Sequence, residues 1–278
     1  MIQPGARVGL VLGGGGVLGG AWEAGALQAL RQETGWDPRD ADCLIGTSVG
    51  SLVAALLAAG ILPDMELVEA AAHHLEAFPW PIPGSWDLGL TGAKERGPRK
   101  WIMTVAGLLP RGPLSTRPIQ DSVEHRIPRG WPARRRLWIT ATDYRTGERV
   151  VFGRFGAPAA DLSTAVAASC AIPGVYPVSS PRVARGARRL ADRLQGVAEH
   201  AAHRNLIAEA DALRASGTPV LLIEPGSADL AAMGLNLMNR KRAHFVFETA
   251  VTTVANQLRS AHMGERLESR TGPAGSIR

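Results

Sequence analysis

The sequence predicts an α/β fold with a mostly parallel sheet that is covered by helices on both faces. Short apolar segments alternate along the chain with segments of helical periodicity, which is typical of βα units. The apolar segments carry few polar residues, as strands do when both faces of a sheet are buried. With 278 residues, 45% of them hydrophobic and 20% charged, the chain has an ordinary globular composition and can build a sizeable core.

The N-terminal part of the chain predicts two consecutive strand–turn–helix units. Residues 6–12 form an apolar, partly β-branched run that four glycines end, and residues 19–32 follow with helical spacing. Residues 41–48 predict a second strand, and residues 49–60 a second helix that Gly60 can terminate. This second helix is apolar on every side and too short, given its glycines, to span a membrane. We therefore expect it inside the domain.

The rest of the chain continues the alternation of predicted strands and helices. Residues 135–144 predict a third strand and residues 146–153 the returning strand of a hairpin. Residues 161–174 predict a helix with Asp161 as its N-cap and Pro173-Gly174 as its end. The later segments are an ambiguous strand end or helix start at 187–192, a helix at 198–217 and a last strand at 218–226.

We expect one domain, over 6–226, followed by a helical tail at 227–278 whose last ten or so residues are disordered. Within the domain, residues 79–118 are crowded with proline and glycine, which indicates loops and short helices and favours a lid or cap. The tryptophan-rich part of the chain is suited either to lipid contact or to a small core of the lid; it comprises Trp80, Pro81, Trp86, Trp101 and Trp131.

The net charge of +6 comes mainly from arginine clusters at 134–136, 182–193 and 240–242. Such clusters are typical of solvated helix faces, and they could also attract an anionic membrane. No aromatic-stacking or recognition-helix motif points to nucleic acid. Cys43 and Cys170 both stand in small, apolar contexts and predict buried reduced thiols; together with the lack of a secretory signal this favours a cytoplasmic protein, with peripheral membrane contact as an option.

Residues 46–50, Gly-Thr-Ser-Val-Gly, fit the motif G-x-S-x-G between a predicted strand and a predicted helix. A serine in such a sharp turn presents its hydroxyl at the end of the sheet. Side chains at Gly46 and Gly50 would collide with the strand or the helix, and the helix N-terminus adds partial positive charge near a developing alkoxide. The pattern predicts a nucleophile elbow with Ser48 as the nucleophile.

The glycine run 13–19 allows three interpretations. Gly14, Gly16 and Gly19 fit the dinucleotide fingerprint G-x-G-x-x-G, with Asp37, Asp40 or Asp42 as the acid that would bind ribose. The run could equally offer adjacent N–H groups as an oxyanion hole, or be only a tight turn. The serine motif one βα unit later favours the oxyanion hole, because a nucleophile and a hole are needed together.

Four blocks taken in order, "GGGGVLGGAWEAGAL", "GTSVGS", "ATDYRTGERVVF" and "ASCAIPGVYPV", resemble the patatin-like phospholipase family. The resemblance extends from about Arg7 to Asp192. It implies a three-layer α/β/α fold and hydrolysis of acyl esters by a Ser–Asp dyad, without metal or cofactor. By position, the resemblance implies Ser48 as nucleophile, Asp192 as base, and the amides of Gly14, Gly15 and Gly16 as the oxyanion hole.

The chain departs from the family pattern at two places. Leu18 stands where the glycine motif often has arginine or lysine, so no cation reinforces the hole. Asp192 is followed by Arg193 and Leu194 where the family has D-G-G or D-G-A, and glycine there permits a backbone path that arginine follows only with strain. Asp192 is still the best candidate base in the sequence.

The leading hypothesis is therefore a serine lipid acyl hydrolase, a phospholipase or esterase. The alternatives are a catalytically impaired relative that binds lipid or a partner protein, and a dinucleotide-binding protein. A Ser–His–Asp triad would be a further rival, with His200 or His203 following Asp192 in the required order. The histidines stand too far from Asp, Glu or Cys to suggest a metal site, and Asp143 is expected to be a turn residue.

Overall fold

The computed structural model describes residues 6–68, 115–133, 136–143, 148–171, 204–234 and 236–270, the last nine of these by their backbone alone. The strands form one open, mixed sheet in the order β1-β2-β3-β4, which is mostly parallel and flanked by helices. The α/β class predicted from the alternating pattern is confirmed. The contacts divide the chain into two compact units, which are described here one at a time.

The first unit holds both strand–turn–helix segments of the N-terminal part. Strand β1 (Gly9–Leu12) leads into helix α1 (Gly16–Thr34), and the short 3₁₀ helix η1 (Pro38–Asp40) leads to strand β2 (Cys43–Thr47) and helix α2 (Val49–Ala58). β1 and β2 are parallel, with Gly9 opposite Cys43 and Leu12 opposite Gly46. This register brings the ends of both strands, and the two turns that follow them, to one edge of the sheet.

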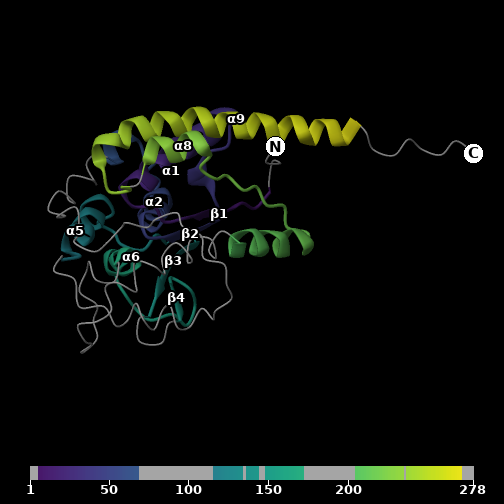
Figure 1. Ribbon diagram of the computed structural model, residues 1–278. Helices are drawn as coiled ribbons and strands as arrows, with labels where there is room; N and C mark the ends of the chain where they lie inside the picture. Colours follow the sequence, from purple (N-terminus) through teal and green to yellow (C-terminus); the bar gives the residue numbers. More distant parts are fainter. Residues whose placement is uncertain are drawn as a thin grey trace, which may run out of the picture. The chain divides into compact units, whose positions relative to one another are not determined.

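The C-terminal helices belong to this same unit. Helix α8 (Ser227–Met233) is followed by the 3₁₀ turn η2 (Arg240–Arg242) and the long helix α9 (Ala243–Arg270), which packs along α1 (Figure 1). Gly25 allows the close approach of α1 and α9, since a Cβ there would lie 2.5 Å from the carbonyl oxygen of Phe247. A glutamate–arginine pair, Glu33 with Arg259, joins the same two helices further along.

One buried carboxylate anchors α8 to α9. Asp229 is 0% exposed, and its Oδ2 accepts a hydrogen bond of 2.8 Å from the N–H of Gly226, just before α8 begins. Its Oδ1 accepts one of 2.7 Å from the Thr253 hydroxyl of α9. Both oxygens are therefore satisfied, as a buried carboxylate requires. The Thr253 bond therefore joins the first turn of α8 to α9.

The second unit contains helix α5 (Arg117–Arg126), strand β4 (Arg149–Phe152), helix α6 (Leu162–Cys170) and most of strand β3 (Arg136–Thr142). β3 and β4 pair antiparallel with Ile139 opposite Phe152, so the predicted hairpin is confirmed. α6 packs against α5, and its Ser163 hydroxyl donates to Glu124 at 2.9 Å. Asp161 is the N-cap of α6 by position, although its side chain bonds no backbone N–H of the helix.

Several sequence predictions need correction. α1 begins at Gly16 rather than at 19, because the helix also includes Val17 and Leu18, which are both buried. Residues 218–226 form no strand: their backbone has no ladder partner in the described part of the chain, and Leu221 is 58% exposed. β1 lies at the edge of the sheet formed by the described residues rather than in a buried position, with Val11 68% exposed. Cys43 and Cys170 are free thiols as predicted, but both are half-buried.

Other predictions fall partly or wholly outside the described residues. These include most of the lid region 79–118, the segment 187–192 and the final residues from 271 onward, and α9 itself continues to Arg270. Helix is present at 204–215 within the predicted 198–217. The boundary between a domain ending at 226 and a separate tail stays a prediction. Among the helices that the structure describes, none combines the length and apolar character needed to cross a bilayer.

Candidate active site

Ser48 occupies the turn between β2 and α2, in a backbone conformation that side chains rarely adopt. Its φ is 55° and its ψ is −126°, and no other non-glycine residue in the described ranges has a positive φ. Conformations of this kind cost on the order of 1–3 kcal/mol and are found where the surroundings enforce them. The first turn of α2 fixes the carbonyl oxygen of Ser48, because the N–H and the hydroxyl of Ser51 both donate hydrogen bonds to it, at 2.8 and 2.5 Å.

The glycines on either side of the turn have no room for a side chain. A Cβ on Gly46 would lie 2.3 Å from the carbonyl oxygen of Gly50, and a Cβ on Gly50 would lie 2.2 Å from that of Gly13. Both contacts are to backbone atoms, which cannot move aside. The chain therefore enters and leaves the Ser48 turn through two points of close backbone contact, and these determine how sharp the turn is.

The first glycine loop lies against this turn. The N–H of Gly50 donates to the carbonyl oxygen of Gly13 at 3.0 Å, which joins the loop to the first turn of α2. A Cβ on Gly14 would lie 3.3 Å from the Cβ of Ser48 and 3.9 Å from its Oγ. Gly14 is exposed and Ser48 is half-buried, so the two residues are close neighbours at an accessible surface.

The loop also carries backbone donors that have no partner among the described residues. The N–H groups of Gly14, Gly15 and Gly16 have no hydrogen bond to any residue that the structure describes. They precede or begin α1, where the first N–H groups of a helix lack intrahelical acceptors. Gly16 has a φ of +61°, which glycine adopts without strain. Unpaired donors at a helix start next to a serine hydroxyl are suited to binding an anion.

Residues 237 and 238 of the C-terminal part close one side of this loop. The N–H of Leu18 donates to the carbonyl oxygen of Leu237 at 2.9 Å, and a Cβ on Gly16 would lie 2.9 Å from the sulfur of Met238. Leu18 itself is fully buried. The place where the family often has a cation is therefore occupied by a core side chain, and its amide is already bonded.

A buried carboxyl group was not singled out in the sequence. Glu23 on α1 is 7% exposed. Its Oε2 has no hydrogen-bond partner among the described residues. Burial raises the pKa of Glu23 to about 8, and the Gly13 N–H opposes this only in part. The sequence feature that could have identified Glu23 is that it is the single charged residue within the apolar helical run "GGAWEAGAL".

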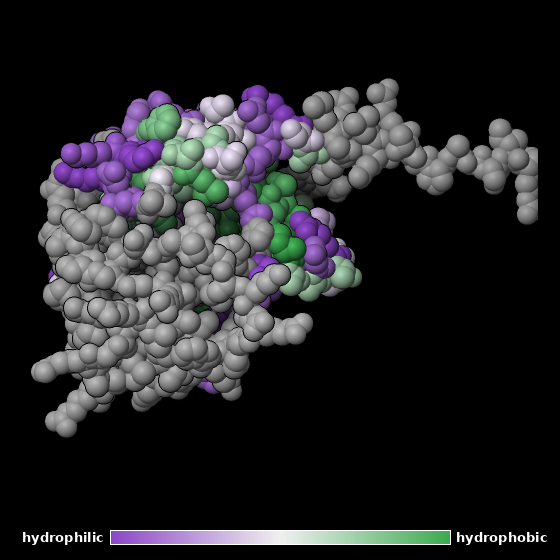
Figure 2. Space-filling view, in the orientation of Figure 1, coloured by the Kyte–Doolittle hydropathy of each residue, from purple (hydrophilic) through white to green (hydrophobic). Residues whose placement is uncertain are grey.

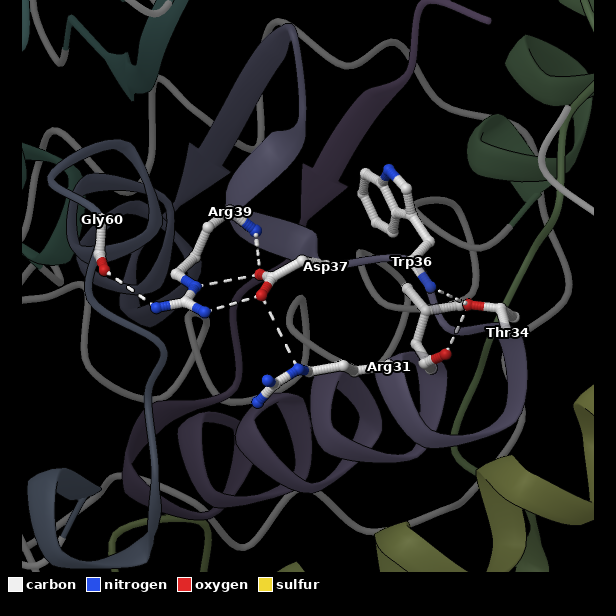
Figure 3. Close-up of polar contacts among 7 residues, drawn as sticks. Arg31, Thr34, Trp36, Asp37, Arg39 and Gly60 are labelled. Carbon is white, nitrogen blue, oxygen red and sulfur yellow. Dashed lines mark hydrogen bonds and ion pairs between the residues drawn. The ribbon is translucent and has the colours of Figure 1, made fainter. Parts of the chain in front are cut away.

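Asp37 and Asp42, two of the three candidate ribose-binding acids, form hydrogen bonds to other groups of the chain. Asp37 receives the backbone N–H and the guanidinium of Arg39, the latter at 2.7 Å, and lies 3.6 Å from Arg31 (Figure 3). The Arg39 hydrogen bond is the main reason that the pKa of Asp37 falls to about 2. Asp42 accepts the N–H of Val8 at 2.8 Å. Asp37 and Asp42 thus stabilise the turn and the first strand.

The remaining candidates are placed as follows. The proposed base Asp192, its neighbours Arg193 and Leu194, and the rival histidines His200 and His203 lie outside the described residues. Asp143 closes the β3–β4 hairpin, where its N–H donates to the Glu148 carbonyl at 2.9 Å. No group of three or more His, Cys, Asp or Glu with the spacing of a metal site occurs in the described ranges.

Comparison with known proteins identifies the family. The chain matches the family model described as patatin-like phospholipase over residues 10–192. No curated protein matches it. Among solved structures it is similar to the crystal structure of the type III effector protein ExoU, at 21% identity and a TM-score of 0.37, over 91% of this chain and 53% of that one, and so spans about half of ExoU's length. The family model covers well over half of the chain, including both glycine loops and Ser48, and the chain belongs to the patatin-like phospholipase family.

Proposed function

We propose that the protein is a serine lipid acyl hydrolase, a phospholipase or esterase, with Ser48 as its nucleophile. The observation that carries the proposal is the strained Ser48 turn, packed against a glycine loop whose amides at 14–16 have no partner among the described residues. Strain at a single side-chain-bearing residue, held by two close glycine contacts, is the arrangement expected of a nucleophile that must project from a sheet edge. Family membership supports acyl-ester hydrolysis at the level of the reaction class.

In the proposed reaction the Ser48 hydroxyl attacks the carbonyl carbon of a fatty-acyl ester. Asp192 accepts the hydroxyl proton, and the N–H groups of Gly14, Gly15 and Gly16 stabilise the negative oxygen of the tetrahedral intermediate. The intermediate collapses, the alcohol leaves with the proton, and the acyl group stays on Ser48. Water then attacks the acyl-enzyme with Asp192 as base, and the free fatty acid is released.

A catalytically impaired relative that binds lipid or a partner protein is the second candidate. The observation that favours it is the sequence Asp192-Arg193-Leu194, which lacks the glycine that the family has after its aspartate. If Arg193 displaces the carboxylate, the proton acceptor is lost while the fold and the glycine loop persist. The nucleophile would then be deactivated although its turn is intact.

A covalent probe distinguishes the two candidates. The purified chain is incubated with a fluorophosphonate and digested, and mass spectrometry locates the adduct, while hydrolysis of a short-chain nitrophenyl ester is followed in parallel. The hydrolase proposal predicts stoichiometric labelling of the peptide that contains Ser48 together with loss of hydrolysis. A folded protein that neither labels at Ser48 nor hydrolyses the ester would favour the impaired relative.

We further propose that the protein binds an anionic membrane surface and takes up its substrate there. Over α8 and the start of α9, hydrophobic and strongly hydrophilic surface lie side by side (Figure 2). The exposed apolar side chains there are Leu230 and Phe245, each 59% exposed, and the basic run 240–242 lies between them in the sequence. Sedimentation with phosphatidylglycerol vesicles, but not with phosphatidylcholine vesicles, is the expected result; equal binding to both would contradict the charge argument.

A further inference from the structure

Residues 236–242, which lead into α9, form a tight turn next to the start of α1; we call this segment the α8–α9 turn. Its backbone bonds itself, because the N–H of Asn239 donates to the Asn236 carbonyl at 3.1 Å and the N–H of Arg242 to the Asn239 carbonyl at 3.0 Å. The guanidinium of Arg242 also donates to the carbonyl oxygen of Ala231 in α8, at 2.9 Å. The turn is therefore fixed both internally and to the helix before it.

One peptide of the α8–α9 turn joins it to α1. The carbonyl oxygen of this peptide belongs to Leu237 and accepts the N–H of Leu18 at 2.9 Å. Its N–H belongs to Met238 and donates to Oδ1 of Asn236, also at 2.9 Å. The two groups lie in one planar trans peptide and point in opposite directions. The Asn236 side chain therefore helps to set the direction in which the Leu237 carbonyl points toward α1.

The amide that this carbonyl binds belongs to the first turn of α1. Because the helix begins at Gly16, the N–H of Leu18 has no acceptor within the helix, and Leu237 supplies one from the C-terminal part of the chain. The same segment covers Gly16, where a Cβ would lie 3.2 Å from the Leu237 carbonyl oxygen and 2.9 Å from the Met238 sulfur. The α8–α9 turn thus holds the start of α1 at two residues.

The first turn of α1 determines where an amide of the glycine loop points. The N–H of Gly19 donates to the carbonyl oxygen of Gly15 at 2.9 Å, which closes this first turn. The N–H of Gly16 lies in the same peptide as that carbonyl and therefore points the opposite way, out of the helix. Helix ends fray, and a frayed first turn would leave this peptide free to rotate. The bond between Leu18 and Leu237 opposes fraying, because Leu18 belongs to the turn that would open.

We propose that Asn236 is a positioning residue of the hydrolase, which acts through the Leu237 carbonyl. Its side-chain oxygen orients that carbonyl, and the carbonyl holds the first turn of α1 so that the amides of the glycine loop are preorganised beside Ser48. This rests on the proposed function of Ser48 and gives a role to a side chain outside the proposed dyad. Preorganised donors stabilise the transition state because they do not have to turn toward the developing charge. A loosened first turn would therefore lower kcat more than it would raise KM.

The experiment compares Asn236→Ala with Asn236→Ser in the full chain. Alanine removes the acceptor of the Met238 N–H, whereas the serine hydroxyl is a neutral acceptor that can bond the backbone two residues on. Asn256→Ala is the matched control, since it makes the same change at an exposed position of α9. For a short-chain nitrophenyl ester we expect Asn236→Ala to lose about five- to tenfold in kcat, with KM changed by less than about twofold. Asn236→Ser should keep kcat within about threefold of wild type, and Asn256→Ala should match the wild type.

A second readout does not depend on activity. Amide hydrogen exchange at Leu18 should accelerate about tenfold in Asn236→Ala, by less than about threefold in Asn236→Ser, and not at all in Asn256→Ala. Circular dichroism verifies that each variant is folded. Unchanged exchange at Leu18 in folded Asn236→Ala would overturn the proposal, and so would a wild-type kcat together with accelerated exchange.

Failure of the proposed function would look different. In that case the wild type itself hydrolyses no ester, and Ser48 takes no fluorophosphonate. Accelerated exchange at Leu18 in Asn236→Ala would then show that the contact exists but serves stability alone, which overturns the positioning role as well.

Discussion

Replacing Ser48 by alanine is expected to lower kcat/KM for a short-chain nitrophenyl ester by at least about a thousandfold. The hydroxyl would form the acyl-enzyme bond, and no other described side chain contacts the glycine loop in a way that could replace it. Fluorophosphonate labelling should disappear with the activity. Ser216→Ala is the control, because that serine is exposed and bonds only its own helix end through the Leu213 carbonyl at 2.7 Å.

Replacing Ser48 by glycine is expected to give a more stable protein than replacing it by alanine. Serine and alanine are both strained at a φ of 55° and a ψ of −126°, whereas glycine adopts this conformation freely. Ser48→Gly is therefore expected to be more stable than Ser48→Ala by about 1 kcal/mol, and to be equally inactive. Urea denaturation followed by circular dichroism measures the difference. If the alanine variant retained the wild-type rate, Ser48 would not be the nucleophile; if glycine gave no gain, the turn would not be strained in solution.

Replacing Glu23 by glutamine is expected to remove a large pH dependence of stability. Burial raises the pKa of Glu23 from 4.5 to about 8 in the folded protein. Between these two values the folded state holds a proton that the unfolded state has released. The contribution is therefore fully present below pH 4.5 and is lost as the pH rises to about 8, with a total of roughly 5 kcal/mol.

The measurement is the free energy of unfolding of the wild type and of Glu23→Gln at pH 5, 7 and 9. All other titrating groups are common to both proteins, so the difference between the two isolates Glu23. Wild type should lose several kcal/mol relative to the variant between pH 5 and pH 9, mostly by pH 8. Glu33→Gln, which removes an exposed ion pair, should follow the wild-type curve within about 1 kcal/mol. Parallel curves for wild type and Glu23→Gln would show that the carboxyl group is hydrated in solution.

The elements that the sequence predicted well are those whose signals are local. The strand–turn–helix pair around Ser48 could be read from apolar runs that glycines interrupt, and the structure has strands and helices there within a few residues of the predicted ends. The hairpin of β3 and β4 was predicted from two β-rich runs with a polar turn between them. In each case the deciding contacts lie between residues that are near one another in the chain.

Predictions that depended on distant partners were less successful. Residues 218–226 have the composition of a strand, yet they have no ladder partner in the described ranges, and Leu221 is mostly exposed. The first strand is apolar enough for a buried position, but it lies at the edge of the described sheet and leaves Val11 in solvent. Composition predicts what a segment can bury, whereas the neighbouring strands and helices decide whether it does.

By itself the sequence determined the family, the α/β class and the placement of Ser48 between two glycines, because steric rules over a few residues leave one workable backbone path there. Tertiary structure alone decided that Leu237 and Met238 close the start of α1, and that Leu18 and Glu23 are buried. Burial and its effect on a carboxyl group depend on atoms contributed from both ends of the chain, and no local pattern carries that information.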